Sequence, residues 1–414
     1  MMTAPWDKDD GSNVVQLDAW RGMLLGDDKG KLDKKFTGNF RLHLQHHPVF
    51  VGRLRYNRFT DEVAVGDLPW RTDGKAWRPI CDADIVRIRE WLQRAEMTPT
   101  LSETADAIFA AALENGFDPV ADFLRGLQWD YKPRLDRWLI DYCGAKDTQY
   151  IAAVSRKWLI SAVARALNPG CKVDTMLVLE GAQGIGKSTV LRILAGDEHF
   201  TEFTADLHDD KRFIEQVKGK WIVEFAELAT MGKADVGTLK ALMTLQVDRA
   251  RMAYARTVSN APRRCVLAAT VNPRADRAYL TDETGNRRFW PVACNAVDIA
   301  ALRANRDQLW AEAVSRFNDG EQWWLSDEET TIAEMVQISR VAVHPWQDIM
   351  SAPGWLADHS AWSSVDLLAK LGVTVKDQTH SNKIVVSSVM RNLGWSNRVT
   401  KVGSRPVKLW QKIS

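Results

Sequence analysis

The residues with the clearest chemical potential lie in one octet, Gly181-Ala182-Gln183-Gly184-Ile185-Gly186-Lys187-Ser188. The octet fits the pattern G-x-x-x-x-G-K-[ST], in which glycines let backbone N–H groups approach phosphates closely. In such a loop Lys187 reaches the β- and γ-phosphates, and the Ser188 hydroxyl can ligate Mg²⁺. The octet, together with Thr189 directly after it, therefore predicts a binding site for ATP and Mg²⁺.

Two carboxylates follow the apolar run 221–223, in the order Glu224-Phe225-Ala226-Glu227. Phosphoryl transfer depends on positioning and electrostatics, so a phosphate loop needs an acidic strand end that holds the metal and polarises water. We assign Glu224 to Mg²⁺ and Glu227 to the attacking water. Capping of the helix that follows is an alternative role for Glu227.

Three further polar residues suit the same chemistry. Asn272 ends the apolar run 265–271, directly before Pro273, where it can sense the γ-phosphate or orient water. A turn-forming Asn-Pro after a core strand is the alternative. Arg287 and Arg288 follow Gly285 on a predicted turn, and either one suits an arginine finger, an arginine that stabilises the transferring phosphate.

The segment 248–288 carries the strongest charge asymmetry inside the chain, with nine arginines, four acidic residues and no lysine. The arginines are Arg249, Arg251, Arg256, Arg263, Arg264, Arg274, Arg277, Arg287 and Arg288. Arginine binds phosphate bidentately, and Tyr254 can stack on a base, so the segment favours a polyanion beyond ATP. Ion pairs with acids of a neighbouring subunit are the alternative.

These residues require strands and a helix that deliver them to one place. Short apolar runs at 175–180, 221–223 and 265–272 predict strands, and 188–194 predicts a helix that leaves the glycine loop and stops at Gly196. Alternating strands and helices over 171–296 indicate an α/β nucleotide-binding core. We expect four regions, namely 1–100, which is of unknown role and holds a small mixed α/β region at 39–67, a helical lead-in at 101–170, an ATPase core at 171–325 and a C-terminal domain at 326–414.

The C-terminal region predicts a winged-helix-like module. Segments 364–372 and 386–393 read as helices, and 399–402 with 406–410 flank Gly403-Ser404 as a hairpin. No acid follows Asp377, whereas seven lysines and arginines do. Nucleic acid is therefore a plausible ligand, with Lys401 and Arg405 as contacts, and a solvated protein-docking face is the alternative.

The composition of the chain indicates which partners and which cellular compartment suit it. The 414 residues carry a formal net charge of only +2, so local charge must decide any polyanion partner. The five cysteines are scattered without a C-x-x-C pair, which suits a reducing compartment. No stretch approaches the roughly 18 apolar residues of a membrane span, and the first residues lack the pattern of a signal peptide. We expect a cytoplasmic protein without a membrane partner.

Taken together, these residues resemble the virulence-associated protein E family, phage and mobile-element P-loop ATPases akin to superfamily 3 helicases. The resemblance covers roughly 115–325 well and both ends weakly. The matching stretches are Asp118-Pro119-Val120, Leu127-Gln128-Trp129-Asp130, 158–164, 181–188, 224–228, 251–254, 284–292 and 306–313.

The resemblance implies a P-loop NTPase core of AAA+-like fold in a hexameric ring that acts on single-stranded or forked DNA in a bacterial host cell. It also implies a separate primase partner, since no catalytic acids for primer synthesis are evident in the first 100 residues. In similar rings the arginine finger enters the adjoining subunit's site. Arg249, Arg251 and Arg256 fall where related enzymes place loops that track the strand.

The leading hypothesis is therefore an ATP-dependent DNA helicase or translocase. One alternative is an origin-binding or loading protein in which ATP only switches assembly and the winged-helix tail recognises DNA. A lesser alternative is a P-loop kinase for a small molecule, against which the arginine-rich segment and the basic tail argue.

Overall fold

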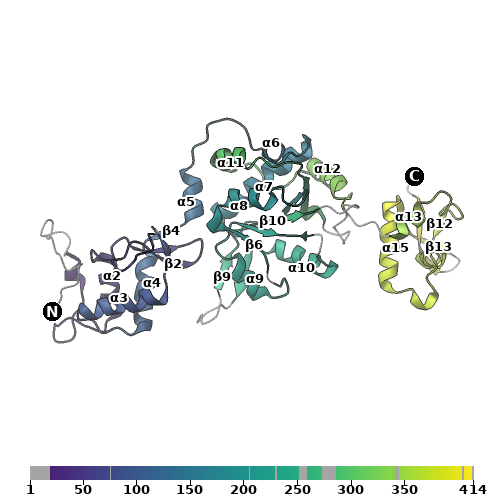
Figure 1. Ribbon diagram of the computed structural model, residues 1–414. Helices are drawn as coiled ribbons and strands as arrows, with labels where there is room; N and C mark the ends of the chain where they lie inside the picture. The colour runs from purple at the N-terminus through teal and green to yellow at the C-terminus, as the bar shows by residue number, and fades with distance from the viewer. Residues whose placement is uncertain are drawn as a thin grey trace.

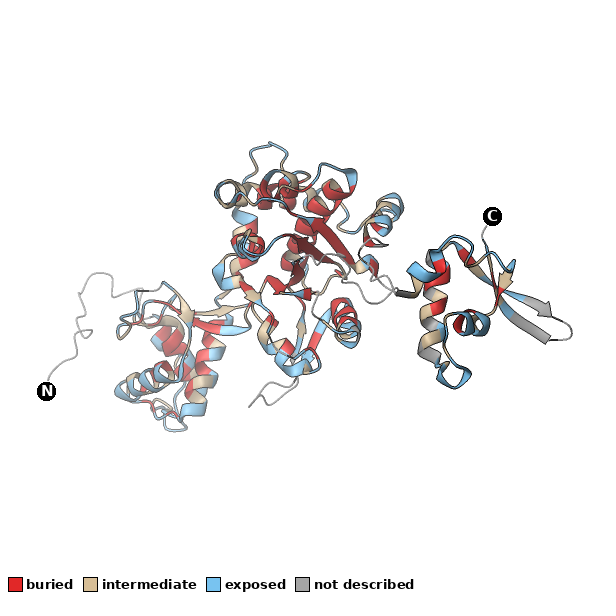
Figure 2. Cartoon of the chain, turned by 45° about the vertical axis from the view of Figure 1, so that its right-hand side comes forward, coloured by how far each residue is buried: buried red, intermediate tan, exposed pale blue. Residues whose placement is uncertain are grey.

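The computed structural model describes residues 19–74, 76–204, 206–228, 231–250, 259–272, 286–338, 340, 345–402 and 405–412. Its helices and strands gather into three groups in chain order (Figure 1). Buried residues concentrate in the central group, above all in its sheet and the helices that cover it (Figure 2). No helix among the described residues is long and apolar enough to cross a bilayer.

The N-terminal group is a small four-stranded sheet with helices packed on it. Its elements are α2 (Thr37–His46), β1 (Leu54–Asn57), β2 (Glu62–Val65), β3 (Arg78–Pro79), α3 (Asp82–Arg94), α4 (Leu101–Leu113) and β4 (Gly116–Phe117). The strand order is β3-β2-β1-β4, with β1 antiparallel to β2 and parallel to β4. This agrees with the small mixed α/β region that the sequence predicts. Helix α4 packs against α2, so it contributes to this core.

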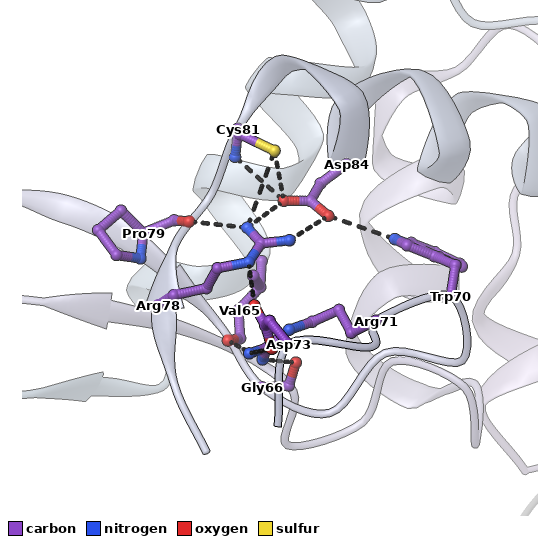
Figure 3. A network of polar contacts seen from close by, with 9 residues as sticks. All are labelled: Val65, Gly66, Trp70, Arg71, Asp73, Arg78, Pro79, Cys81 and Asp84. Carbon is purple, nitrogen blue, oxygen red and sulfur yellow. Dashed lines mark hydrogen bonds and ion pairs between the residues drawn. The ribbon is translucent and has the colours of Figure 1, made fainter. Parts of the chain in front are cut away.

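A polar network ties β3 to α3 in this group (Figure 3). Both Arg78 terminal nitrogens donate to the Asp84 carboxylate, at 2.6 and 3.0 Å, and Trp70 Nε1 donates to it at 3.3 Å. Burial alone would raise the pKa of Asp84, but these donors and the Cys81 backbone N–H lower it to about 2. The carboxylate is thus held ionised at a helix start, which serves structure rather than catalysis.

Three helices lead from this group into the central one, namely α5 (Pro119–Gly126), α6 (Trp138–Cys143) and α7 (Gln149–Leu167). Asp118 caps α5 by accepting from the Ala121 N–H, and Thr148 caps α7 in the same way through Ile151. Helix α7 is buried along most of its length because it lies on the central sheet. Its Trp158 donates from Nε1 to the Leu267 carbonyl at 3.2 Å.

The central group is a mixed α/β layer structure around a five-stranded sheet of order β11-β5-β10-β7-β6, all of whose pairs are parallel. The strands are β5 (Met176–Glu180), β6 (Phe200–Glu202), β7 (Ile222–Phe225), β10 (Val266–Val271) and β11 (Phe289–Ala293). The helices are α8 (Lys187–Ala195), α9 (Asp210–Val217), α10 (Lys233–Thr244), α11 (Ile299–Asn318) and α12 (Asp327–Ile338). The predicted strands at 175–180, 221–223 and 265–272 are confirmed within one or two residues.

Parallel strands covered on both faces are apolar along most of their length, which explains why their sequences show no alternation. Along β5, Leu177 and Leu179 join one core cluster, whereas Met176 and Val178 join the other. Alternate residues thus fill opposite faces, as strand geometry requires. Between α10 and β10 the chain also forms a separate two-stranded antiparallel sheet, made of β8 (Val247–Ala250) and β9 (Ser259–Pro262).

The C-terminal group has its own core, built from residues such as Trp362, Leu367, Met390 and Trp410. Its elements are α13 (Pro345–Ser351), β12 (Ala361–Trp362), α14 (Ser364–Lys370), α15 (His380–Asn392), β13 (Trp395–Val402) and β14 (Arg405–Lys412). The two helices and the hairpin occur where the sequence predicts them, although α15 begins six residues earlier than expected. The earlier start follows from Thr379, whose side chain accepts from the Asn382 N–H and caps the helix.

Glu312 on α11 joins the lead-in to the central group. This fully buried carboxylate accepts from the backbone N–H groups of Arg134 and Leu135, at 2.6 and 2.9 Å, and from Arg316 at 3.3 Å. One turn earlier, Gln308 exchanges hydrogen bonds with the backbone of Gln128 and Asp130. Hydrogen bonds from side chains of α11 to the loop backbone therefore hold loop 127–135 in place, without any backbone-to-backbone strand pairing in this fully described loop.

Replacing Glu312 with alanine removes the acceptor of two backbone N–H groups, so we expect the free energy of unfolding to fall by about 2–4 kcal/mol. Glu312→Gln keeps one side-chain oxygen and should lose only about 1 kcal/mol. Thermal and urea unfolding followed by circular dichroism compares the two variants. Equal stability of Glu312→Ala and wild type would show that this carboxylate does not hold the loop.

Candidate functional site

The glycine loop lies between β5 and α8, at the carboxyl edge of the parallel sheet. Gly184 and Gly186 have φ of 83° and 99°, a backbone region that other residues rarely adopt. A side chain at position 181 would meet the Cys294 carbonyl oxygen at 2.6 Å, so this position also needs glycine. The positions of the motif glycines thus follow from backbone geometry, and the loop turns into the first turn of α8.

Lys187 closes the loop from within. Its Nζ donates to the carbonyl oxygens of Gly181 and Ala182, at 2.7 and 2.8 Å, and to Asn272 Oδ1 at 3.0 Å. Lys187 is only 7% exposed, and this burial lowers the pKa of its ammonium group. The structure therefore brings Lys187 and Asn272 together, although they are 85 residues apart in the chain.

Glu224 lies at the same edge and is fully buried on β7. Its Oε1 accepts from Ser188 Oγ and from Thr270 Oγ1, both at 2.7 Å. Its Oε2 is buried without a hydrogen-bond partner within the described part of the chain. Burial raises the pKa of this carboxyl, and the two hydroxyl donors oppose that rise. The arrangement leaves one carboxylate oxygen beside the Ser188 hydroxyl to accept a hydrogen bond or a cation.

The remaining predicted residues of the loop flank this pair. Ala182, Gln183, Gly184 and Thr189 are exposed, Ile185 and Gly186 are half-buried, and Gly181 is buried. Glu227 is exposed in the turn after β7, with φ of 54°. The N-cap of α10 is Gly232, so Glu227 does not cap that helix.

Arg287 and Arg288 lie at the other edge of the sheet. They form a short 3-10 turn, η4 (Asn286–Arg288), directly before β11. Strand β11 runs parallel to β5, with Phe289 opposite Met176 and Ala293 opposite Glu180. The two arginines are therefore separated from the glycine loop of their own chain by the length of a strand, roughly 15 Å. Gly285 lies outside the described residues.

The predicted nucleic-acid contacts are only partly placed. Arg249 is exposed on β8, whereas Arg251, Tyr254 and Arg256 lie outside the described residues. Lys401 and Arg405 lie beside the turn of the β13–β14 hairpin, where Val402 pairs with Arg405, and their side chains are not among those described.

Two arginines of the 248–288 segment serve the fold of the chain itself. Arg263 is buried and forms an ion pair with Asp248, with Nε donating to Oδ2 at 3.1 Å. Arg264 forms an ion pair with Asp118 at the start of α5. Both guanidinium groups are paired with carboxylates of the same chain, so the charge asymmetry of this segment overstates its free positive charge.

Two residues at the loop edge were missed by sequence reasoning. Thr270 is the polar residue inside an apolar strand, a weak signal that only the register with β7 makes meaningful. Glu180 ends β5 and receives two hydrogen bonds from Arg340, from Nε and Nη2, each at 2.9 Å. The two residues are 160 positions apart in the chain, so no local pattern reveals this pair.

Residues 124–342, more than half of the chain, match the family described as the Virulence-associated protein E-like domain. No curated protein matches the chain. An A form apo structure of the NrS-1 C terminal region is 12% identical, with a TM-score of 0.43, and the match covers 87% of this chain and 96% of that one. A further apo structure of the same region is 12% identical, with a TM-score of 0.45 and coverage of 86% and 95%.

Replacing Thr270 with valine keeps the shape of the side chain and removes one of the two donors to Glu224. We expect unfolding near neutral pH to become easier by about 1.5–3 kcal/mol, because the bond to an ionised carboxylate is lost. The effect should shrink as the pH falls through the raised pKa of Glu224, where the carboxyl is neutral. Urea unfolding at several pH values measures this, with Thr270→Ser as the control that keeps the hydroxyl. A loss independent of pH would contradict the assignment.

Proposed function

The chain belongs to the virulence-associated protein E-like domain family, and from this premise we propose that it is an ATP hydrolase of phage or mobile-element DNA replication. Its central group is then a P-loop NTPase core, and hydrolysis drives movement along single-stranded DNA as a helicase or translocase. The observation that carries the proposal is the meeting of the glycine loop, Lys187 and the Ser188–Glu224 pair at one sheet edge.

The residues at this edge fit ATP with Mg²⁺. Exposed backbone at 182–184 and the start of α8 present N–H groups and a positive helix end to phosphates. Ser188 Oγ and the unpartnered Glu224 Oε2 are oxygen donors of the kind that Mg²⁺ prefers. When bound, this ion neutralises phosphate charge. No group of three or more metal-ligating side chains occurs among the described residues, which suits an ion shared with a nucleotide rather than an all-protein cage.

The chain's own groups then divide the work of hydrolysis. Lys187 gives up its contacts with the Gly181 and Ala182 carbonyls and donates to the β- and γ-phosphates instead. Asn272, already beside Lys187 at 3.0 Å, contacts the γ-phosphate. Glu227, exposed in the turn after β7, orients the attacking water and accepts its proton. Positioning and electrostatics supply most of the rate in such a site.

The arginine finger acts between subunits in this proposal. Arg287 and Arg288 lie across the sheet from the loop, so within one chain neither reaches the nucleotide. A neighbour related by rotation can present its arginine edge to this loop edge, and such head-to-tail contacts close into rings. We therefore propose a homo-oligomeric, hexameric ring in which each ATP site is completed by the next subunit.

Single-stranded or forked DNA is the proposed partner. Exposed Arg249 stands on β8, and the C-terminal group ends in two helices, α14 and α15, followed by a hairpin, which is the element order of a winged helix with a basic end. Lys401 and Arg405 lie beside the turn that would form the wing. A separate primase would supply primers to such a machine.

Steady-state ATP hydrolysis with and without single-stranded DNA tests the function directly. We expect DNA to stimulate hydrolysis by the wild type. Lys187→Ala should lower the hydrolysis rate about 10²–10³-fold, because it removes the cation that contacts the transferring phosphate. Lys146→Ala, an exposed lysine near the start of α7, is the matched control. Hydrolysis indifferent to DNA would favour an ATP-switched loading protein, and transfer of phosphate to a metabolite would reveal a kinase.

Mixing two inactive variants tests the finger between subunits. The Arg287→Ala subunit keeps an intact glycine loop, and the Lys187→Ala subunit keeps an intact arginine. In a random equal mixture about a quarter of the sites then combine an intact loop with an intact arginine from the next subunit, so about a quarter of the wild-type activity should return. Arg288→Ala, mixed in the same way, identifies which arginine acts. Hydrolysis at the wild-type rate by Arg287→Ala and Arg288→Ala alone would refute the finger, and mixtures without any recovery would refute the exchange between subunits.

A further inference from the structure

A cavity of about 520 Å³ lies at the amino edge of the central sheet, across from the glycine loop. It is bounded by the residues before β5, by η4, by the loop between α11 and α12, and by one face of α12. Three tryptophans line it, Trp290 from β11 and the neighbours Trp323 and Trp324. The volume is within the range of small-molecule sites, about 300–1,000 Å³.

Two buried donors at this cavity lack acceptors. Trp290 is 1% exposed, yet its Nε1 finds no hydrogen-bond partner within the described part of the chain. The same holds for Arg288 Nε. A buried N–H group left unpaired is unfavourable, and an occupant whose acceptor atoms reached these two groups would remove that cost.

The rim of the cavity carries positive charge. Lys172, whose side chain is 70% exposed, stands there with Arg287 and Arg288, against a single acid, Asp174. Lys172 and Asp174 are 3.7 Å apart, so part of that charge is balanced and the two arginines remain. The walls are aromatic as well. Trp324 is 49% exposed and meets Trp323 edge to face at a centroid distance of 5.3 Å, leaving an indole surface open to a flat ligand.

We propose that this cavity is a second nucleotide site, distinct from the glycine loop. A base stacks on the tryptophans and accepts hydrogen bonds from Trp290 Nε1 and Arg288 Nε, and its phosphate meets Lys172 at the rim, which leaves Arg287 as the finger toward the next subunit. A base has both a flat face and ring acceptors, and a phosphate suits the cationic rim, so a nucleotide matches all three observations. It arrives either as free nucleotide or as one unit of a DNA strand.

The test uses the full chain with Lys187→Ala, which disables the proposed ATP loop, so its result does not depend on hydrolysis there. Equilibrium dialysis with radiolabelled ATP should still find binding to this chain. Adding Trp324→Ala should weaken that binding about 5- to 100-fold, the usual cost of losing a stacking partner. Tyr131→Ala, which removes an aromatic ring that is 82% exposed and outside the cavity, is the matched control.

A second variant guards against an effect of Trp324 on folding. Thr330→Trp fills the cavity from α12 without removing any of its tryptophans or cations, and it should weaken binding by a similar factor. Titration of both variants with oligothymidylate distinguishes the sources. A loss confined to ATP assigns the cavity to free nucleotide, and a loss confined to the oligonucleotide assigns it to a strand. Unchanged binding of both probes by both variants would overturn the proposal.

Discussion

The central group depends on one buried carboxylate, that of Glu224. Burial makes its ionised form costly, and hydroxyl groups from two other elements, Ser188 on α8 and Thr270 on β10, offset that cost. Such a meeting is possible because the strands are parallel and adjacent, so their carboxyl ends and the loop after β5 share one edge. One oxygen of Glu224 stays unmatched among the described residues, and the buried Lys187 stands nearby as a cation whose own charge is stabilised by this carboxylate.

Much of this edge could be predicted from the sequence, because strand ends and glycine loops are local features. The strands around 176–180, 222–225 and 266–271, and the helix after the loop, follow from apolar runs and their breaks. The resting contacts of Lys187 could not be predicted. They depend on a loop that folds back on its own carbonyls and on the register that brings Asn272 beside it. Thr270 gains meaning only from the pairing of β10 with β7.

The role of the arginines in 248–288 was harder to predict from the sequence than the positions of strands and helices. A count of arginines along the chain cannot show which acids fold against them. Arg263 meets Asp248, 15 residues away, whereas Arg264 meets Asp118, 146 residues away. Both acids belong to the same chain as the arginines. For these two arginines the alternative of ion pairs therefore describes the structure better than a polyanion does, but the pairs form inside one subunit rather than between subunits. The exposed Arg249 keeps the polyanion interpretation open at one described position.

Helix α12 connects the two edges of the sheet that carry the candidate chemistry. Its Gln337 donates to the Phe289 carbonyl at the start of β11, at 2.8 Å, and also lines the tryptophan cavity. One turn later, Arg340 binds Glu180, the last residue before the glycine loop. Gln337 lies near the carboxyl end of α12 and Arg340 lies two residues beyond it, so a shift of this end would break both contacts, each of which is costly to leave unmade.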